Sequence, residues 1–116
     1  MAIPKVYNAI IDKMIEQTEN GLIYWNKNTF EIFETNLGKN YVRIWAGQDE
    51  NEVPFVSFAL LSGVRELLDS WFVEANENEY PKMKEFYDNI KRSRKELREA
   101  IKDLSTILDA NELDFL

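Results

Sequence analysis

The hydrophobic positions of residues 80–108 repeat with the spacing of a heptad. Apolar residues follow one another in steps of four and three, and Arg94 is the one polar interruption in a series that comprises Met83, Tyr87, Ile90, Leu97, Ile101, Leu104 and Leu108. The segment lacks glycine, and Pro81 stands near its start, where the first helical turn tolerates proline. This pattern predicts a long helix over 80–108. Such a helix would reach roughly 40 Å, which exceeds the width of a domain of this size.

This predicted helix has two ways to cover its apolar stripe. Ser93 to Glu96 reads Ser-Arg-Lys-Glu, which matches a capping box and favours a break near Ser93. The part after the break, 94–108, would then fold back on the same core. Alternatively the helix continues, and a second copy of the chain covers Leu97, Ile101, Leu104 and Leu108. The sequence leaves both alternatives open.

The first 21 residues have the pattern of an amphipathic helix. One broad face is apolar, and it consists of Ile3, Val6, Tyr7, Ile10, Ile11, Met14 and Ile15. Pro4 suits a first helical turn, and Gly21 after Asn20 is a typical stop signal. We therefore expect a helix over Ile3 to Asn20.

Residues 29–73 alternate between apolar and polar positions as an antiparallel meander does. We expect strands at Thr29 to Thr35, Tyr41 to Ala46 and Pro54 to Leu61. Residues 64–73 are ambiguous, and Trp71-Phe72-Val73 favours a fourth, edge strand. The side chains predicted to face the helices are Phe30, Ile32, Val42, Ile44, Val56, Phe58 and Leu60.

These elements predict one two-layer α+β domain over 1–116, with the helices on one face of the sheet. The segments are the helix 1–21, the meander 29–73, the helix 80–108 and an acidic tail 109–116. This order resembles small domains of unknown function from bacterial and phage proteins. The landmarks of the resemblance are Asn20 to Trp25, Asp69-Ser70-Trp71, and Tyr80, Met83, Phe86 and Tyr87 ahead of Lys91-Arg92. The resemblance implies the fold and supports an extended conformation for 64–73, and it implies no catalytic residues.

Two surfaces are candidates for binding a protein partner. If both helices cover one sheet face, the other face would present Phe33, Tyr41, Arg43 and Trp45, with Phe55 a further candidate, and such residue types are enriched in interface hot spots. The alternative is that 26–28, 64–73 or the tail covers these aromatic residues. The second surface is a basic strip of Lys91, Arg94, Lys95 and Arg98, which could bind phosphate or an acidic protein or could simply be a solvated helix face.

The net charge of the chain argues against one class of binding partner. The net charge is −7, with 13 acidic and 6 basic residues in 1–80, 5 acidic and 8 basic in 81–108, and 3 acidic in the last eight. An acidic protein is poorly suited to nonspecific nucleic-acid binding, which depends on neutralising phosphates. No apolar stretch is long enough for a membrane span, and the first residues lack the apolar region of a secretory signal.

The composition argues against most enzymatic chemistry. Histidine and cysteine are absent, and this excludes Ser-His-Asp triads, cysteine nucleophiles and ordinary zinc sites. Neither a phosphate-binding loop nor EF-hand spacing occurs, so we expect no cofactor and no metal. A hydrolase that uses a metal with Asp49 and Glu52 is the least favoured hypothesis.

The sequence thus favours a non-enzymatic protein-binding module that forms a homodimer. A phage or mobile-element accessory protein, for example an inhibitor of a host factor, is the role that the resemblance suggests. The alternative is a small-ligand or nucleotide-binding domain that uses Arg43 and the basic residues 91–98. The lack of cysteine is typical of a cytoplasmic protein.

Overall fold

The computed structural model describes residues 3–28, 31–92 and 95–114. The elements follow in the order α1 (Lys5–Glu19), β1 (Asn26–Lys27), β2 (Phe33–Leu37), β3 (Asn40–Gln48), β4 (Pro54–Leu61), β5 (Leu67–Glu74), α2 (Tyr80–Arg92) and α3 (Lys95–Asp114). The strands form one antiparallel sheet in the order β1-β2-β3-β4-β5. The prediction of an α+β domain with an antiparallel meander is confirmed.

The strands differ from the predicted ones at the start of the meander. The polar residues Asn26 and Lys27 form an additional short strand, β1, and β2 begins at Phe33 rather than at Thr29. Glu31 lies between them with a φ of 61°, in the left-handed region that a non-glycine residue seldom adopts. The edge strand predicted within 64–73 is confirmed as β5, which pairs with β4.

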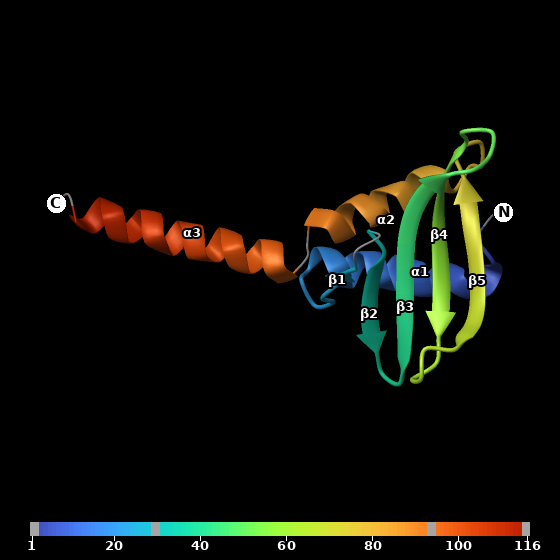
Figure 1. Cartoon of the computed structure of the whole chain (residues 1–116), viewed down its shortest axis with the longest axis horizontal. Helices are drawn as coiled ribbons and strands as arrows, with labels where there is room; N and C mark the ends of the chain where they lie inside the picture. Colours follow the sequence, from blue (N-terminus) through green and yellow to red (C-terminus); the bar gives the residue numbers. More distant parts are fainter. Residues whose placement is uncertain (1–2, 29–30, 93–94, 115–116) are drawn as a thin grey trace.

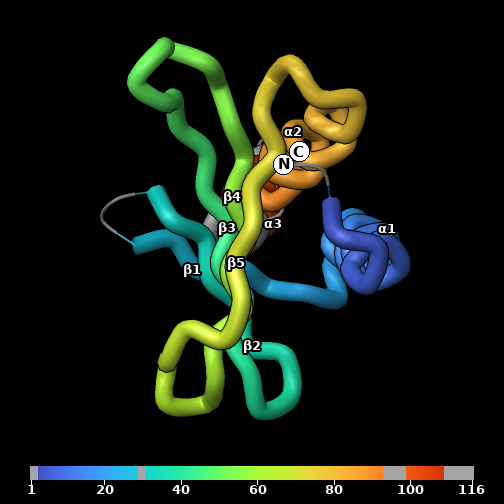
Figure 2. Tube along the Cα trace, turned by 90° about the vertical axis from the view of Figure 1, so that its right-hand side faces the viewer, coloured from blue at the N-terminus to red at the C-terminus, as the bar shows by residue number. Residues whose placement is uncertain are grey.

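Helices α1 and α2 lie on the same side of the sheet, as Figure 2 shows with the sheet edge-on. Aromatic side chains fill the space between the two layers. Tyr7 of α1 contacts Phe58 at 5.0 Å between ring centroids, and Phe58 stacks on Trp71 at 4.9 Å. Phe86 of α2 meets Trp25 at 5.9 Å. The single core therefore joins both helices to the strands.

The predicted core of the sheet is largely confirmed. Val42, Ile44, Val56 and Phe58 are buried against the helices. Leu60 is half-buried and packs against this core. Ile32 is half-buried but does not belong to the core, whereas its neighbour Phe33 does. Phe30 lies outside the described residues.

The buried face of α1 is narrower than the sequence predicts. Tyr7, Ile11 and Met14 are buried, but Val6 is 72% exposed and Ile10 is 45% exposed. Only one side of a helix can rest on a second layer, so the outer positions of a broad apolar face remain in solvent. Gly21, with a φ of 74°, follows the end of the helix as predicted.

The predicted long helix consists of two helices, of which α2 ends at Arg92 and α3 begins at Lys95. Residues 93 and 94 themselves lie outside the described residues. Figure 1 shows that α3 does not fold back on the core but projects away from the body. α3 also extends to Asp114, so that helix replaces most of the predicted tail.

Candidate functional site

The sheet face opposite the helices carries three of the predicted binding residues. Tyr41, Arg43 and Trp45 alternate along β3 with the buried Val42 and Ile44, and all three side chains are half-buried. Neither α1 nor α2 covers this face (Figure 2). We call it the outer sheet face.

The prediction that Phe33 belongs to the outer sheet face is wrong. Phe33 is opposite Ile44 in the β2–β3 register, so both side chains point to the helices. Its exposed fraction is 2%, and its ring meets Tyr87 of α2 at 5.5 Å. The left-handed Glu31 interrupts the extended chain just before β2, so the alternation counted from Phe30 does not continue into the strand.

One half of the outer sheet face is closed by its own ion pairs. Arg43 Nε donates to Glu34 Oε2 at 2.7 Å, and Arg65 Nε donates to Glu34 Oε1 at 3.1 Å. The Arg65 guanidinium also lies over the ring of Tyr41, 4.2 Å from its centroid. Burial raises the pKa of Glu34, but the hydrogen bonds and charges of the two arginines outweigh it and hold this pKa below its ordinary value. This half therefore already satisfies its charged groups.

The other half of the outer sheet face contains a hollow of about 370 Å³. Trp45, Ser57 and Phe72 are neighbours across β3, β4 and β5, so a small side chain lies between two large rings. In the adjacent row Gly47 is opposite Phe55, whose Cζ lies 3.0 Å from the place of a Cβ on that glycine. The ring of Phe55 thus occupies the space that the missing side chain leaves.

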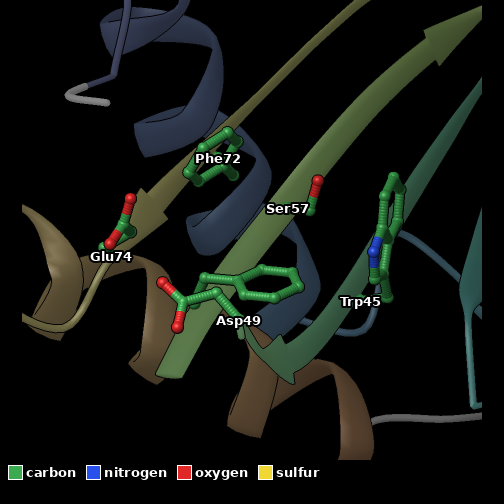
Figure 3. A pocket seen from close by; sticks show the side chains of 6 residues that line it. Trp45, Asp49, Ser57, Phe72 and Glu74 are labelled. Carbon is green, nitrogen blue, oxygen red and sulfur yellow. The ribbon is translucent and has the colours of Figure 1, made fainter. Parts of the chain in front are cut away.

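Two carboxylates belong to the same end of this hollow, as Figure 3 shows. Asp49 begins the β3–β4 turn, where its Oδ1 accepts hydrogen bonds from the backbone N–H groups of Asn51 and Val53 at 2.8 and 3.0 Å. Glu74 ends β5 and is half-buried. Among the described residues no three acidic side chains come together as a metal-binding group.

The predicted basic strip does not join the outer sheet face. Lys91 is exposed on α2, on the helix side of the sheet, and its Nζ lies 5.4 Å from the centroid of the Tyr87 ring. Arg94 lies outside the described residues, and the structure describes only the backbone at Lys95 and Arg98. Arg43 and Lys91 are therefore on opposite sides of the sheet.

The predicted self-association stripe lies on α3 and is exposed. Ile101, Leu104 and Leu108 are 53%, 59% and 61% exposed, and Ile107 beside them is 56% exposed. The structure describes only the backbone at Leu97. Every side chain described on this helix, from residue 99 to residue 108, is exposed.

Sequence reasoning missed most of the hollow. It selected Trp45 and named Phe55 as a further candidate, but it did not select Phe72, Asp49 or Glu74. The alternation of Trp71, Phe72 and Val73 is a signal that could have placed Phe72 on the outer sheet face. The two carboxylates carry no such signal, because only the strand register brings them to one end.

Comparisons of this chain with protein-family models, with curated proteins and with solved structures find no match. Among the described residues, none of the helices combines the length and apolar character that crossing a membrane requires.

Proposed function

We propose that this chain is a non-enzymatic protein-binding module that self-associates through α3. The observation that carries the proposal is the position of this 20-residue helix, which projects from the body with its apolar stripe in solvent (Figure 1). The molecule is 58 Å long with a radius of gyration of 17.2 Å. A compact chain of this length would have a radius of about 13 Å.

An exposed helix of this kind is expected to need a partner. Isolated helices shorter than about 12–15 residues are marginal in water, and longer ones depend on packing of an apolar face for most of their stability. Leu104 and Leu108 would each contribute about 1 kcal/mol if their exposed surface became buried. A partner that covers the apolar stripe would therefore stabilise α3 itself.

The charge pattern of α3 favours a second copy in antiparallel orientation. Residues 95–102 contain three basic and two acidic side chains, and residues 103–114 contain four acidic and no basic ones. Antiparallel pairing brings the first part of each helix beside the acidic part of the other. In heptad positions, Ile101 would pair with Leu104 of the second copy and Leu97 with its Leu108. The basic residues 91–98 then face the acidic end of the partner helix.

This proposal is tested by sedimentation equilibrium over a series of concentrations. Two helices of this size bury less surface than a standard interface, so we expect a dimer that dissociates in the micromolar range. The mass should approach twice 13.7 kDa at high concentration. Leu104→Glu should give a folded monomer, because this side chain is exposed and does not belong to the core.

Thr106→Glu is the matched control, since it adds the same charge to the opposite side of α3. Its hydroxyl only donates to the Lys102 carbonyl oxygen at 3.0 Å, so the variant should still dimerise. A wild-type protein that remains monomeric at every concentration would contradict self-association. A Leu104→Glu variant that unfolds would show instead that the stripe belongs to the core of the monomer.

The orientation of the helices can be tested separately with cysteines, because the chain has none of its own. Ile101→Cys and Leu104→Cys chains, mixed and oxidised, should form disulfides with each other faster than either does with itself. Antiparallel pairing places these two positions in one layer, whereas a parallel pair would join identical positions. Faster cross-linking of identical chains would contradict the antiparallel arrangement.

The proposal also includes a biological role for the module. The resemblance to small bacterial and phage domains suggests an accessory role, such as inhibition of a host factor. The alternative, a nucleotide site that combines Arg43 with residues 91–98, receives less support. Arg43 is already paired with Glu34, and Lys91 lies on the other side of the sheet.

A further inference from the structure

We propose that the hollow of the outer sheet face binds a lysine side chain presented by a partner protein. The hollow is lined by residues of β3, β4, β5 and the β3–β4 turn, so this inference is independent of α3 and of self-association. Its chemistry differs from that of the closed half of the same face, where Arg43 and Arg65 neutralise Glu34.

The walls of the hollow are aromatic. Phe55 and Phe72 meet edge to face at 6.0 Å between ring centroids, and Trp45 lies across Ser57 from Phe72 (Figure 3). Phe72 is 37% exposed, so part of its ring remains available for contact. Such walls can pack against the methylene stem of lysine, and their faces attract an ammonium group.

The charged groups that line the hollow are the carboxylates of Asp49 and Glu74. Within residues 3–28 and 31–92 and the described side chains of α3, neither Asp49 nor Glu74 forms an ion pair. Two carboxylates beside three aromatic rings would repel an anion. They would attract an ammonium group, which loses part of its hydration when it packs against the rings. A purely apolar occupant would supply no opposite charge for these carboxylates. Charge complementarity therefore selects a basic side chain.

The floor of the hollow permits a long side chain to enter. Ser57 is the small residue between Trp45 and Phe72, and its hydroxyl donates to the Trp71 carbonyl oxygen at 3.4 Å. The volume of about 370 Å³ falls within the range of small-molecule sites. A lysine stem can thus lie along the rings while its ammonium group reaches the carboxylates.

The test uses Nα-acetyl-lysine N-methylamide as the probe and NMR of the ¹⁵N-labelled full chain as the readout. The indole N–H signal of Trp45 should move on titration. Trp25 and Trp71 are buried on the helix side of the sheet, at 1% and 3% exposure, so their signals should stay in place. The norleucine analogue, which has a methyl group in place of the ammonium, should bind about tenfold more weakly.

Two variants test the composition of the site. Phe72→Ala and Glu74→Gln should each weaken binding of the lysine probe about two- to fivefold. Glu66→Gln makes the same charge change at the opposite end of the sheet and should bind like the wild type. An unchanged signal of Trp25, which packs against Phe86 in the core, shows that each variant is folded.

Several results would overturn the inference. These are a Trp45 signal that does not move with the lysine probe, equal binding of the norleucine analogue, and full binding by both Phe72→Ala and Glu74→Gln. The monomeric variant Leu104→Glu should give the same Trp45 shift as the wild type. Loss of the shift in that variant would contradict a site that is independent of α3.

Discussion

The two C-terminal helices carry parts of one heptad stripe, yet they have opposite surroundings. In α2 the stripe is buried, since Met83 and Ile90 are inaccessible to solvent. In α3 the stripe continues at Ile101 and Leu104, and both side chains are more than half exposed. The sheet supplies a surface for α2 but does not extend beneath α3 (Figure 1). The same spacing of apolar residues therefore serves the core in one helix and remains available for a partner in the other.

The largest effect that could test this comparison comes from truncating one side chain in each helix. Phe86 of α2 is fully buried against Trp25, and Phe86→Ala should lower the free energy of unfolding by about 3–5 kcal/mol. Leu104→Ala in α3 should change it by less than about 0.5 kcal/mol at concentrations where the chain is monomeric. Urea denaturation measures both values. Equal losses in the two helices would show that α3 belongs to the core of the monomer.

The sequence could predict the stripe but not its division between core and solvent. Heptad spacing is continuous from Met83 to Leu108, and the position at which the sheet ends depends on tertiary packing that the pattern does not record. The capping box at Ser93 did indicate where one helix gives way to another. Much of the fold thus follows from periodicity, including the antiparallel meander and the edge strand β5.

The candidate site was harder to predict, for two local reasons. The left-handed Glu31 resets the alternation before β2, and this places Phe33 in the core instead of on the outer sheet face. The hollow depends on register, since Asp49 and Glu74 are 25 positions apart and line one hollow only because β4 pairs with both β3 and β5. A register cannot be read from the composition of the strands.

A substitution with a smaller expected effect would locate the end of the core along α2. Asn89, near the end of α2, is 6% exposed, and its Nδ2 donates to Glu19 Oε1 of α1 at 2.9 Å. Its Oδ1 accepts a hydrogen bond from Arg92 Nη2. We expect Asn89→Ala to cost about 1–3 kcal/mol in urea denaturation, because buried polar partners lose their bonds.

Asn78→Ala is the control for this change, since Asn78 is exposed in the loop before α2. It should alter the free energy of unfolding by no more than about 0.5 kcal/mol. If Asn89→Ala is as harmless as this control, the last turn of α2 is not part of the cooperative core. The boundary between the two helices would then lie before Ser93.

The smallest effect concerns the alkaline titration of α2, which has no counterpart in α3 because α3 contains no tyrosine. Burial raises the pKa of Tyr87 above its ordinary value of 10.0; the charges of Glu31 and Asp88 raise it further, and Lys84 lowers it in part. The folded state thus holds this proton more tightly than the unfolded state does. The resulting stability is fully present below pH 10 and is lost as the pH rises through the pKa of the folded protein. In urea denaturation at a series of alkaline pH values, Tyr87→Phe should lose stability less steeply than the wild type.

Tyr7, whose pKa is raised to about 12 by burial and by its hydrogen bond to Asp69, is retained in both proteins, so the difference isolates Tyr87. Parallel curves for the two proteins would contradict a buried environment for Tyr87 and, with it, the packing of Tyr87 against Phe33 of β2.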